Sequence, residues 1–204
     1  MKILFITGFL IPEFNHIYND IIEVLNSKCY TTTIYFNYNI DIQKLIDKIN
    51  THYLDTYTHI ILYSSSYILY PFIKNNNKKI IIINPVIVNP IHAITNQYIK
   101  LFEPNTFRAI LYCIIGIQIT EPLDLHIFIN YLSIFFKRLI KFISRHNPQW
   151  NNDKSLWEGK KTIYIIGRYD ILTNIIIKPQ NIIYINAKHH INKENAEEVI
   201  KHIH

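Results

Sequence analysis

Glycine and cysteine are scarce in this sequence. Its 204 residues include four glycines and two cysteines, Cys29 and Cys113. Two cysteines are too few for a disulfide framework, so we expect buried, unpaired thiols and a reducing compartment, the cytoplasm. The first apolar run is not followed by a Gly-x-Gly-x-x-Gly motif, which argues against a nucleotide-binding domain of the Rossmann or flavodoxin type.

Long hydrophobic runs are also missing. The longest, at residues 109–119, is well short of the ~20 apolar residues that a membrane-spanning helix needs. The apolar run at residues 2–7 is interrupted by Gly8 and Pro12 and has no small-residue cleavage site after it. It therefore predicts a buried strand and not a signal peptide. We expect no stable membrane insertion.

Charge is moderate in amount and mixed in sign. Charged residues make up 18% of the chain and hydrophobic ones 49%, which favours one domain over residues 1–204 with a sizeable apolar core. The formal net charge is +6, but Lys and Arg are spread along the chain. This spread favours a solvated basic surface over a nucleic-acid partner. Heavy use of Ile, Asn, Lys and Tyr suggests an AT-rich genome, such as that of a virus, and a host cytoplasm as the location.

Short apolar runs alternate with stretches of helical periodicity. The predicted strands are residues 2–7, 30–38, 58–63, 79–84, 162–166 and 181–186, and the predicted helices are residues 14–25, 42–49, 67–73 and 194–203. Alternation of this kind indicates right-handed crossovers and an α/β fold with a mostly parallel sheet covered on both faces. Residues 86–150 break the alternation, and we expect them to form a helical lid inserted into the domain.

Polar residues follow four of the predicted strands. They are Thr7 and Gly8, the run from Ser64 to Ser66, the segment from Arg168 to Asp170, and the segment from Lys188 to His190. The carboxyl ends of parallel strands meet at one edge of the sheet, where ligands bind. The chain order of serine, acid and histidine is the order found in α/β-hydrolases.

Several segments resemble the α/β-hydrolase superfamily, in particular its small YqiA-like esterases. The matching features are the Thr-Gly-Phe turn that ends residues 3–9, the serine run, Asn84-Pro85 and Asn89-Pro90 after the fourth strand, Gly167-x-x-Asp170, and His189 followed by the Glu-Asn-Ala-Glu-Glu-Val of residues 194–199. The resemblance implies an α/β-hydrolase-like three-layer sandwich with a short helical lid. It also implies a serine esterase activity without a cofactor.

By this resemblance, Ser65 is the nucleophile, His189 is the general base and acid, and Asp170 orients the histidine. A serine hydroxyl is a weak nucleophile until a histidine takes its proton, and a carboxylate on the other ring nitrogen holds the useful tautomer. The backbone N–H groups of Phe9 and Ser66 would bind the oxyanion. The expected substrate is a small ester or other acyl compound.

The nucleophile turn departs from the family pattern Gly-x-Ser-x-Gly. That pattern has small residues two positions to either side because the turn is strained and crowded. The possible registers are Ser65 between Tyr63 and Tyr67, Ser64 between Leu62 and Ser66, and Ser66 between Ser64 and Ile68. Each leaves at least one bulky neighbour, and Ser65 is preferred on the alignment of the other segments. The alternative function is an inactive hydrolase-like protein that binds a partner.

The site residues also have simpler interpretations. The serine run could cap a helix, Asp170 could be a turn residue, and His190 competes with His189 for the catalytic position. His202 and His204 could be metal ligands, but no cysteine or carboxylate lies at ligand spacing from them. We therefore expect no metal.

Overall fold

The computed structural model describes residues 1–8, 12–37, 40–74, 78–85, 162–170, 173 and 181–203. The predicted lid at residues 86–150 and the predicted oxyanion residue Phe9 lie outside these ranges.

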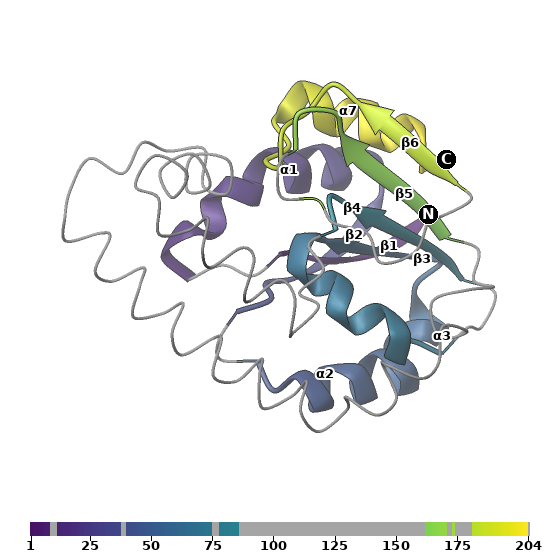
Figure 1. Cartoon of the computed structure of the whole chain (residues 1–204). Helices are drawn as coiled ribbons and strands as arrows, with labels where there is room; N and C mark the ends of the chain where they lie inside the picture. The colour runs from purple at the N-terminus through teal and green to yellow at the C-terminus, as the bar shows by residue number, and fades with distance from the viewer. Residues whose placement is uncertain are drawn as a thin grey trace.

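A parallel sheet forms the centre of the molecule (Figure 1). Within the described residues it has six strands, which are β1 (Lys2–Ile6), β2 (Tyr30–Ile34), β3 (His59–Tyr63), β4 (Lys79–Ile83), β5 (Thr162–Gly167) and β6 (Ile182–Ile185). Their order is β2-β1-β3-β4-β5-β6, and every neighbouring pair is parallel. The α/β fold class is confirmed. The second strand ends at Ile34, earlier than the predicted residue 38.

The helices fall where the apolar periodicity places them, with irregular turns that it does not predict. They are the 3₁₀ helix η1 (Pro12–Tyr18), α1 (Asn19–Lys28), α2 (Ile42–Lys48), the π-helical turn η2 (Ile49–Tyr53), α3 (Leu54–Thr56), the 3₁₀ helix η3 (Ser64–Phe72) and α7 (Lys193–Lys201). Asp41 caps α2, because its carboxylate accepts a hydrogen bond from the backbone N–H of Lys44.

Alternate strand residues face two separate helical layers. Leu4, Ile60 and Ile82 belong to a core shared with α2 and η3, whereas Ile3 and Ile61 belong to a core shared with α1 and α7. Figure 1 shows α1 and α7 on one side of the sheet and α2 and α3 on the other. Burial on both faces explains why the strands read as nearly continuous apolar runs instead of alternating ones.

The strand order reverses next to β1. The chain passes from β1 to β2 on one side and then returns to place β3 on the other side of β1. In open parallel sheets this reversal, at the carboxyl ends of the strands, is where ligands bind. Gly8 follows β1 and Ser64 follows β3, so the glycine turn and the serine run flank this point.

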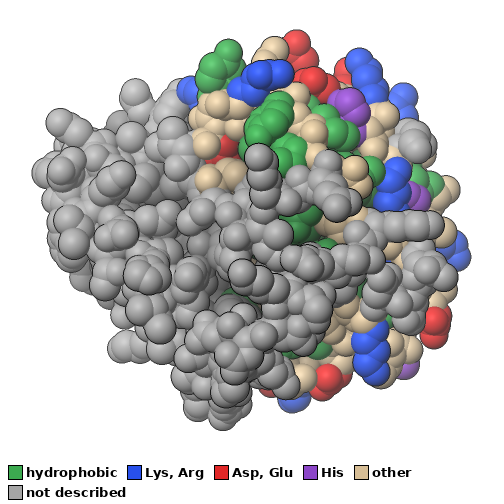
Figure 2. Space-filling model, turned by 45° about the vertical axis from the view of Figure 1, so that its right-hand side comes forward, with side chains coloured by type: hydrophobic (Ala, Val, Ile, Leu, Met, Phe, Trp, Pro, Cys, Tyr) green, Lys and Arg blue, Asp and Glu red, His purple; other side chains and the backbone are tan. Residues whose placement is uncertain are grey.

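The described helices include none that is long and apolar enough to cross a bilayer. On the face drawn in Figure 2, basic and acidic side chains of the described part are interspersed and not gathered by sign.

Candidate active site

The turn after β3 holds one serine in an unusual backbone conformation. Ser64, the first residue of η3, has φ 56°, which lies in the left-handed region that L-residues other than glycine seldom adopt. Ser66 stabilises the turn, because its single O–H is shared between the carbonyl oxygens of Ile6 at 3.0 Å and Tyr63 at 2.9 Å. A sharp strand-to-helix turn of this kind raises the Ser64 side chain above the end of the sheet.

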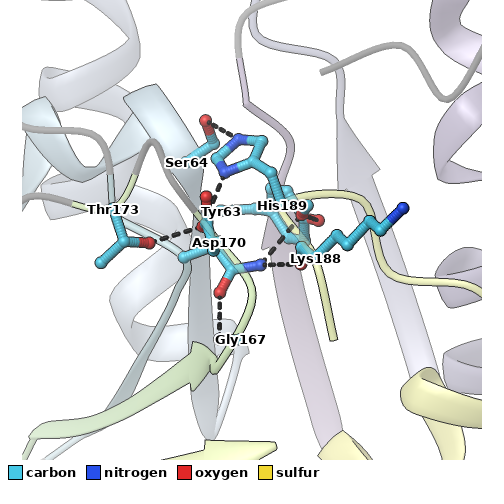
Figure 3. Close-up of polar contacts among 8 residues, drawn as sticks. Tyr63, Ser64, Gly167, Asp170, Thr173, Lys188 and His189 are labelled. Carbon is cyan, nitrogen blue, oxygen red and sulfur yellow. Dashed lines mark hydrogen bonds and ion pairs between the residues drawn. The ribbon is translucent and has the colours of Figure 1, made fainter. Parts of the chain in front are cut away.

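Ser64, His189 and Asp170 form a continuous chain of hydrogen bonds (Figure 3). Ser64 Oγ lies 2.8 Å from His189 Nε2, and His189 Nδ1 lies 2.8 Å from Asp170 Oδ2. A carboxylate only accepts, so Nδ1 carries the proton and Nε2 is left to accept from the serine hydroxyl. The side chains of His189 and Asp170 are 5% and 0% exposed, so little water competes with this arrangement.

The structure places a different serine of the run beside the histidine from the one that was predicted. It brings Ser64, instead of the predicted Ser65, to the histidine. The physical reason is the crowding two positions away. With Ser64 at the turn, Ser66 lies two positions after it and is small. Leu62 lies two positions before it and packs into the layer of α2 and η3. The smallness of Ser66 was the sequence signal for this register.

Ser66, the predicted oxyanion donor, lies two positions after Ser64, whereas Ser65 follows Ser64 directly.

Gly8 brings the backbone after β1 directly against Ser64. A Cβ at this position would lie 2.7 Å from Ser64 Cβ and 2.7 Å from the Tyr18 hydroxyl oxygen, which is closer than any side chain tolerates. The preceding Thr7 is fully buried, and its hydroxyl donates to the Gly8 carbonyl and accepts the N–H of Phe36, both at 3.0 Å. Only glycine therefore fits beside Ser64 without displacing it.

The two adjacent histidines have different environments. His189 contacts both Ser64 and Asp170. His190 Nε2 instead donates to the carbonyl oxygen of Ile17 in η1 at 2.7 Å. The structure thus brings His189, the preferred histidine of the sequence analysis, into the hydrogen-bonded chain and gives His190 a structural contact.

Asp170 is both a turn residue and a member of the site. Its backbone N–H donates to the carbonyl of Gly167 at 3.0 Å, so it closes a turn after β5. Its Oδ2 atom also accepts from Thr173 Oγ1 at 2.5 Å. Thr173 was not predicted, and its position soon after the acid was the only signal for it.

Asn84 is a second site residue that sequence reasoning did not assign. It is fully buried and has φ 45°. Its Nδ2 atom donates to the carbonyl oxygens of Lys188 at 3.0 Å and His189 at 2.9 Å, and its Oδ1 atom accepts the N–H of Gly167 at 2.7 Å. In the sequence, Asn84 stands out only as part of the Asn84-Pro85 pair.

Tyr63, the last residue of β3, contacts the histidine loop, which is the connection between β6 and α7 at residues 186–192. Its hydroxyl donates to the carbonyl oxygen of His189, and its ring packs edge-on against the imidazole. Burial, together with the neighbouring Tyr18 and Asp170, raises the pKa of the Tyr63 phenol. The phenol therefore remains a hydrogen-bond donor throughout the neutral range.

Metal-ligating side chains do not gather in the described ranges, which contain no cluster of three His, Cys, Asp or Glu side chains that could hold an ion.

Comparison with known proteins gives one informative likeness. Neither a protein-family model nor a curated protein sequence matches this chain. Among solved structures, epoxide hydrolase I from potato (Solanum tuberosum) superposes with a TM-score of 0.53 at 11% identity, over 99% of this chain and 91% of that one. A match at 11% identity supports a statement about the fold alone. Together with the parallel sheet, it shows that the chain has an α/β-hydrolase-like fold.

Proposed function

We propose that this protein is a serine hydrolase that cleaves a carboxylic ester or a related acyl bond. Ser64 is the nucleophile, His189 the general base and acid, and Asp170 the orienting carboxylate. The observation that carries the proposal is the hydrogen-bonded chain from Ser64 Oγ through the imidazole to Asp170, with 2.8 Å at both contacts.

The reaction follows from the direction of these hydrogen bonds. His189 Nε2 takes the Ser64 proton as the oxygen attacks the acyl carbon, and Asp170 stabilises the imidazolium that results. The protonated ring then gives its proton to the leaving group. In the second half, His189 takes a proton from water as the water oxygen bonds to the acyl carbon. The bond from that carbon to the Ser64 oxygen breaks, the serine oxygen recovers the proton, and the carboxylic acid product leaves without the use of a cofactor.

The oxyanion of the tetrahedral intermediate needs two N–H donors. The N–H of Ser65 is one, since it follows the nucleophile, and the N–H of Phe9 after Gly8 is the expected other. The close approach of Gly8 to Ser64 supports this assignment, because it brings the backbone after β1 beside the reacting oxygen.

The backbone of Ser64 favours an enzyme over an inactive binding protein. A serine that only caps a helix needs no left-handed φ, whereas Ser64 has φ 56° and points its hydroxyl at His189. Local strain of this kind persists where the surrounding contacts hold it, commonly at functional sites. Tyr67, one of the bulky neighbours of the turn, packs into the layer of α2, away from the α1 and α7 layer that contains Tyr63.

The finer type of enzyme rests on the sequence resemblance. Asn84-Pro85 and the Glu-Asn-Ala-Glu-Glu-Val segment at residues 194–199 favour a small YqiA-like esterase. A viral source and a cytoplasmic location remain predictions from composition.

A fluorophosphonate probe tests the nucleophile directly. The serine oxygen bonds to phosphorus, fluoride leaves, and the serine proton passes to the histidine. We expect the native protein to label, Ser64→Ala to lose labelling completely, and Ser65→Ala to retain it because the Ser65 contribution is a backbone N–H. Labelling that depends on Ser65 or Ser66 and survives in Ser64→Ala would overturn the assignment.

The histidine and the acid are tested in the same assay. His189→Ala and Asp170→Asn should each slow labelling by about 10⁴-fold, as in other triads, whereas His190→Ala should label at nearly the native rate. An ester panel of increasing acyl length then defines the substrate. A folded native protein that neither labels nor cleaves any ester would instead indicate the inactive binding protein.

A further inference from the structure

We propose that Asn84 and Tyr63 are positioning residues that set the place of the His189 imidazole by holding the backbone carbonyl groups of the histidine loop. The inference rests on the proposed function, since it explains how the triad geometry is maintained. In this role each side chain acts through a backbone carbonyl and not on the substrate.

The histidine loop needs such an anchor because of its place in the fold. His189 lies between β6 and α7, and β6 is the last strand in the order of the described sheet. A loop after an edge strand has a pairing partner on one side alone, and loops are more mobile than the elements they connect. Proton transfer between serine and histidine, however, tolerates errors of only about 0.5 Å.

Asn84 satisfies this need with its whole amide group. Its two N–H bonds reach the carbonyls of Lys188 and His189, and its oxygen accepts the N–H of Gly167 at the end of β5. Its own backbone N–H donates to the carbonyl of Ile165 at 3.0 Å. One side chain therefore connects the ends of β4 and β5 to the loop after β6.

The backbone of Asn84 adopts an unfavourable conformation at this connection. Its φ of 45° is unfavourable for most residues and tolerated best by glycine, asparagine and aspartate. Glycine has no amide to offer, and aspartate cannot donate. Asparagine is thus the residue type that accepts this conformation and also provides two donors and an acceptor.

Tyr63 adds a second donor to the same carbonyl. Its hydroxyl and Asn84 Nδ2 both donate to the oxygen of His189, which uses both of its lone pairs. Tyr63 also directly precedes Ser64 at the end of β3. Tyr63 therefore links the nucleophile, which follows it in the chain, to the base, whose carbonyl accepts its hydrogen bond. A shift of one relative to the other breaks this buried bond.

The acid is tied to the histidine loop independently. The N–H groups of Arg168 and Tyr169 donate to the carbonyls of Ile185 at 2.9 Å and Ala187 at 3.1 Å. These bonds make one unit of the loops that carry the base and the acid, and Asn84 connects this unit to the end of β4. Loss of the Asn84 donors should let this unit move relative to Ser64.

Three variants separate the contributions. Asn84→Asp keeps the acceptor for Gly167 but loses both donors. Asn84→Gly accepts the backbone conformation and removes all three side-chain bonds. Tyr63→Phe removes a single hydroxyl, so it tests the proposal even where the Asn84 variants fail to fold.

Two control variants remove comparable bonds elsewhere. Asn50→Asp alters an asparagine whose amide also donates to one backbone group and accepts from another, because Asn50 donates to the Phe72 carbonyl and accepts the N–H of Lys74, both at 2.9 Å. Tyr70→Phe removes a buried hydroxyl that contacts Thr162 Oγ1 at 2.9 Å. These changes should affect stability without affecting the histidine.

The measurement has one readout that requires no turnover. An Nδ1 proton held against a carboxylate exchanges slowly and gives a far-downfield proton resonance, which we expect in the native protein. It should broaden or vanish in Asn84→Asp, Asn84→Gly and Tyr63→Phe, and persist in Asn50→Asp and Tyr70→Phe. Thermal unfolding of each variant shows that the fold is retained.

The second readout is the rate of fluorophosphonate labelling. We expect a fall of about 10²-fold for Asn84→Asp, the effect of a displacement of about 1 Å at a catalytic group, and a smaller fall for Tyr63→Phe. The probe concentration at half-maximal rate should not change. If the native protein shows the resonance but does not label, the serine hydrolase proposal fails while the resonance still tests the positioning role. An unchanged resonance in folded Asn84→Asp and Tyr63→Phe, or its equal loss in the controls, would overturn the inference.

Discussion

Two glycines are required at the site because of space and not because of backbone freedom. A Cβ on Gly167 would lie 2.4 Å from the backbone oxygen of Ala187 and 2.8 Å from that of Lys188. These are main-chain atoms of the histidine loop, so they cannot rotate away. Gly8 meets the Ser64 side chain and the Tyr18 hydroxyl in the same way. Each glycine thus permits a loop to approach the residues that carry the proposed chemistry.

Alanine at either glycine should be destabilising. We expect Gly167→Ala to lower the free energy of unfolding by about 1–3 kcal/mol, the usual range for overpacking, and to slow fluorophosphonate labelling because the histidine loop must retreat. Gly8→Ala should abolish labelling even where the protein stays folded, because the new methyl group displaces Ser64. Urea unfolding and the labelling assay check both. Native stability and labelling in Gly167→Ala would contradict the close approach.

At the scale of elements, the helix after the histidine loop limits how far that loop can move. The side chain of Asn192 caps α7 by accepting the N–H of Asn195 at 2.9 Å. The helix then buries Ala196, Val199 and Ile200 in the layer that it shares with α1. The loop is therefore fixed at its far end by a cap and at its near end by β6.

Removal of the cap should cost stability more than activity. Asn192→Ala is expected to lower the free energy of unfolding by about 1 kcal/mol and to leave labelling within a few-fold of native, because the carbonyls of the loop remain held by Asn84. Urea unfolding measures the first effect. Lys193→Ala is the control on the same helix, since its ion pair with Glu23 joins side chains that are 57% and 64% exposed and should contribute much less. A larger loss in the control than in Asn192→Ala would contradict the capping role.

At the scale of the whole molecule, tyrosines are buried on both faces of the sheet. Burial raises the pKa of the phenols of five of them, Tyr18, Tyr63, Tyr67, Tyr70 and Tyr164, and it raises that of Tyr164 to about 12. Unfolded tyrosine loses its proton near pH 10. The folded protein consequently holds more protons than the unfolded chain above that pH.

Stability should therefore fall in alkaline solution. Below about pH 10 these phenols are protonated in both states and contribute no pH dependence. Above it, each raised phenol lowers the free energy of unfolding by about 1.4 kcal/mol per pH unit until its folded pKa is reached. Urea unfolding across this range, with tyrosinate absorbance as a second probe, measures the slope. Tyr63→Phe should reduce this slope by about 1.4 kcal/mol per pH unit, the contribution of one phenol. A stability that does not change with pH in this range would contradict the burial of these side chains.

The sequence by itself determined the architecture and the location of the site. Buried parallel strands are apolar on both faces, so the positions of β1 to β6 could be read from runs such as the isoleucines of β4. Polar residues that directly follow such runs must lie at one edge of the sheet. Asp170 and His189, which are 19 positions apart, follow two of these runs. The resemblance to α/β-hydrolases predicts that they meet, and the structure places them in contact.

Tertiary structure decided which serine faces the histidine and how the histidine is held. The choice of Ser64 over Ser65 depends on the left-handed backbone of one residue. The periodicity of the sequence does not predict this conformation, although the small size of Ser66 agrees with it. The bonds from Asn84 span 104 and 105 positions in sequence, and an isolated asparagine after a strand gives no sign of its partners. Strand positions follow from local composition, whereas the register of the turn and the contacts of the loops depend on packing between distant segments.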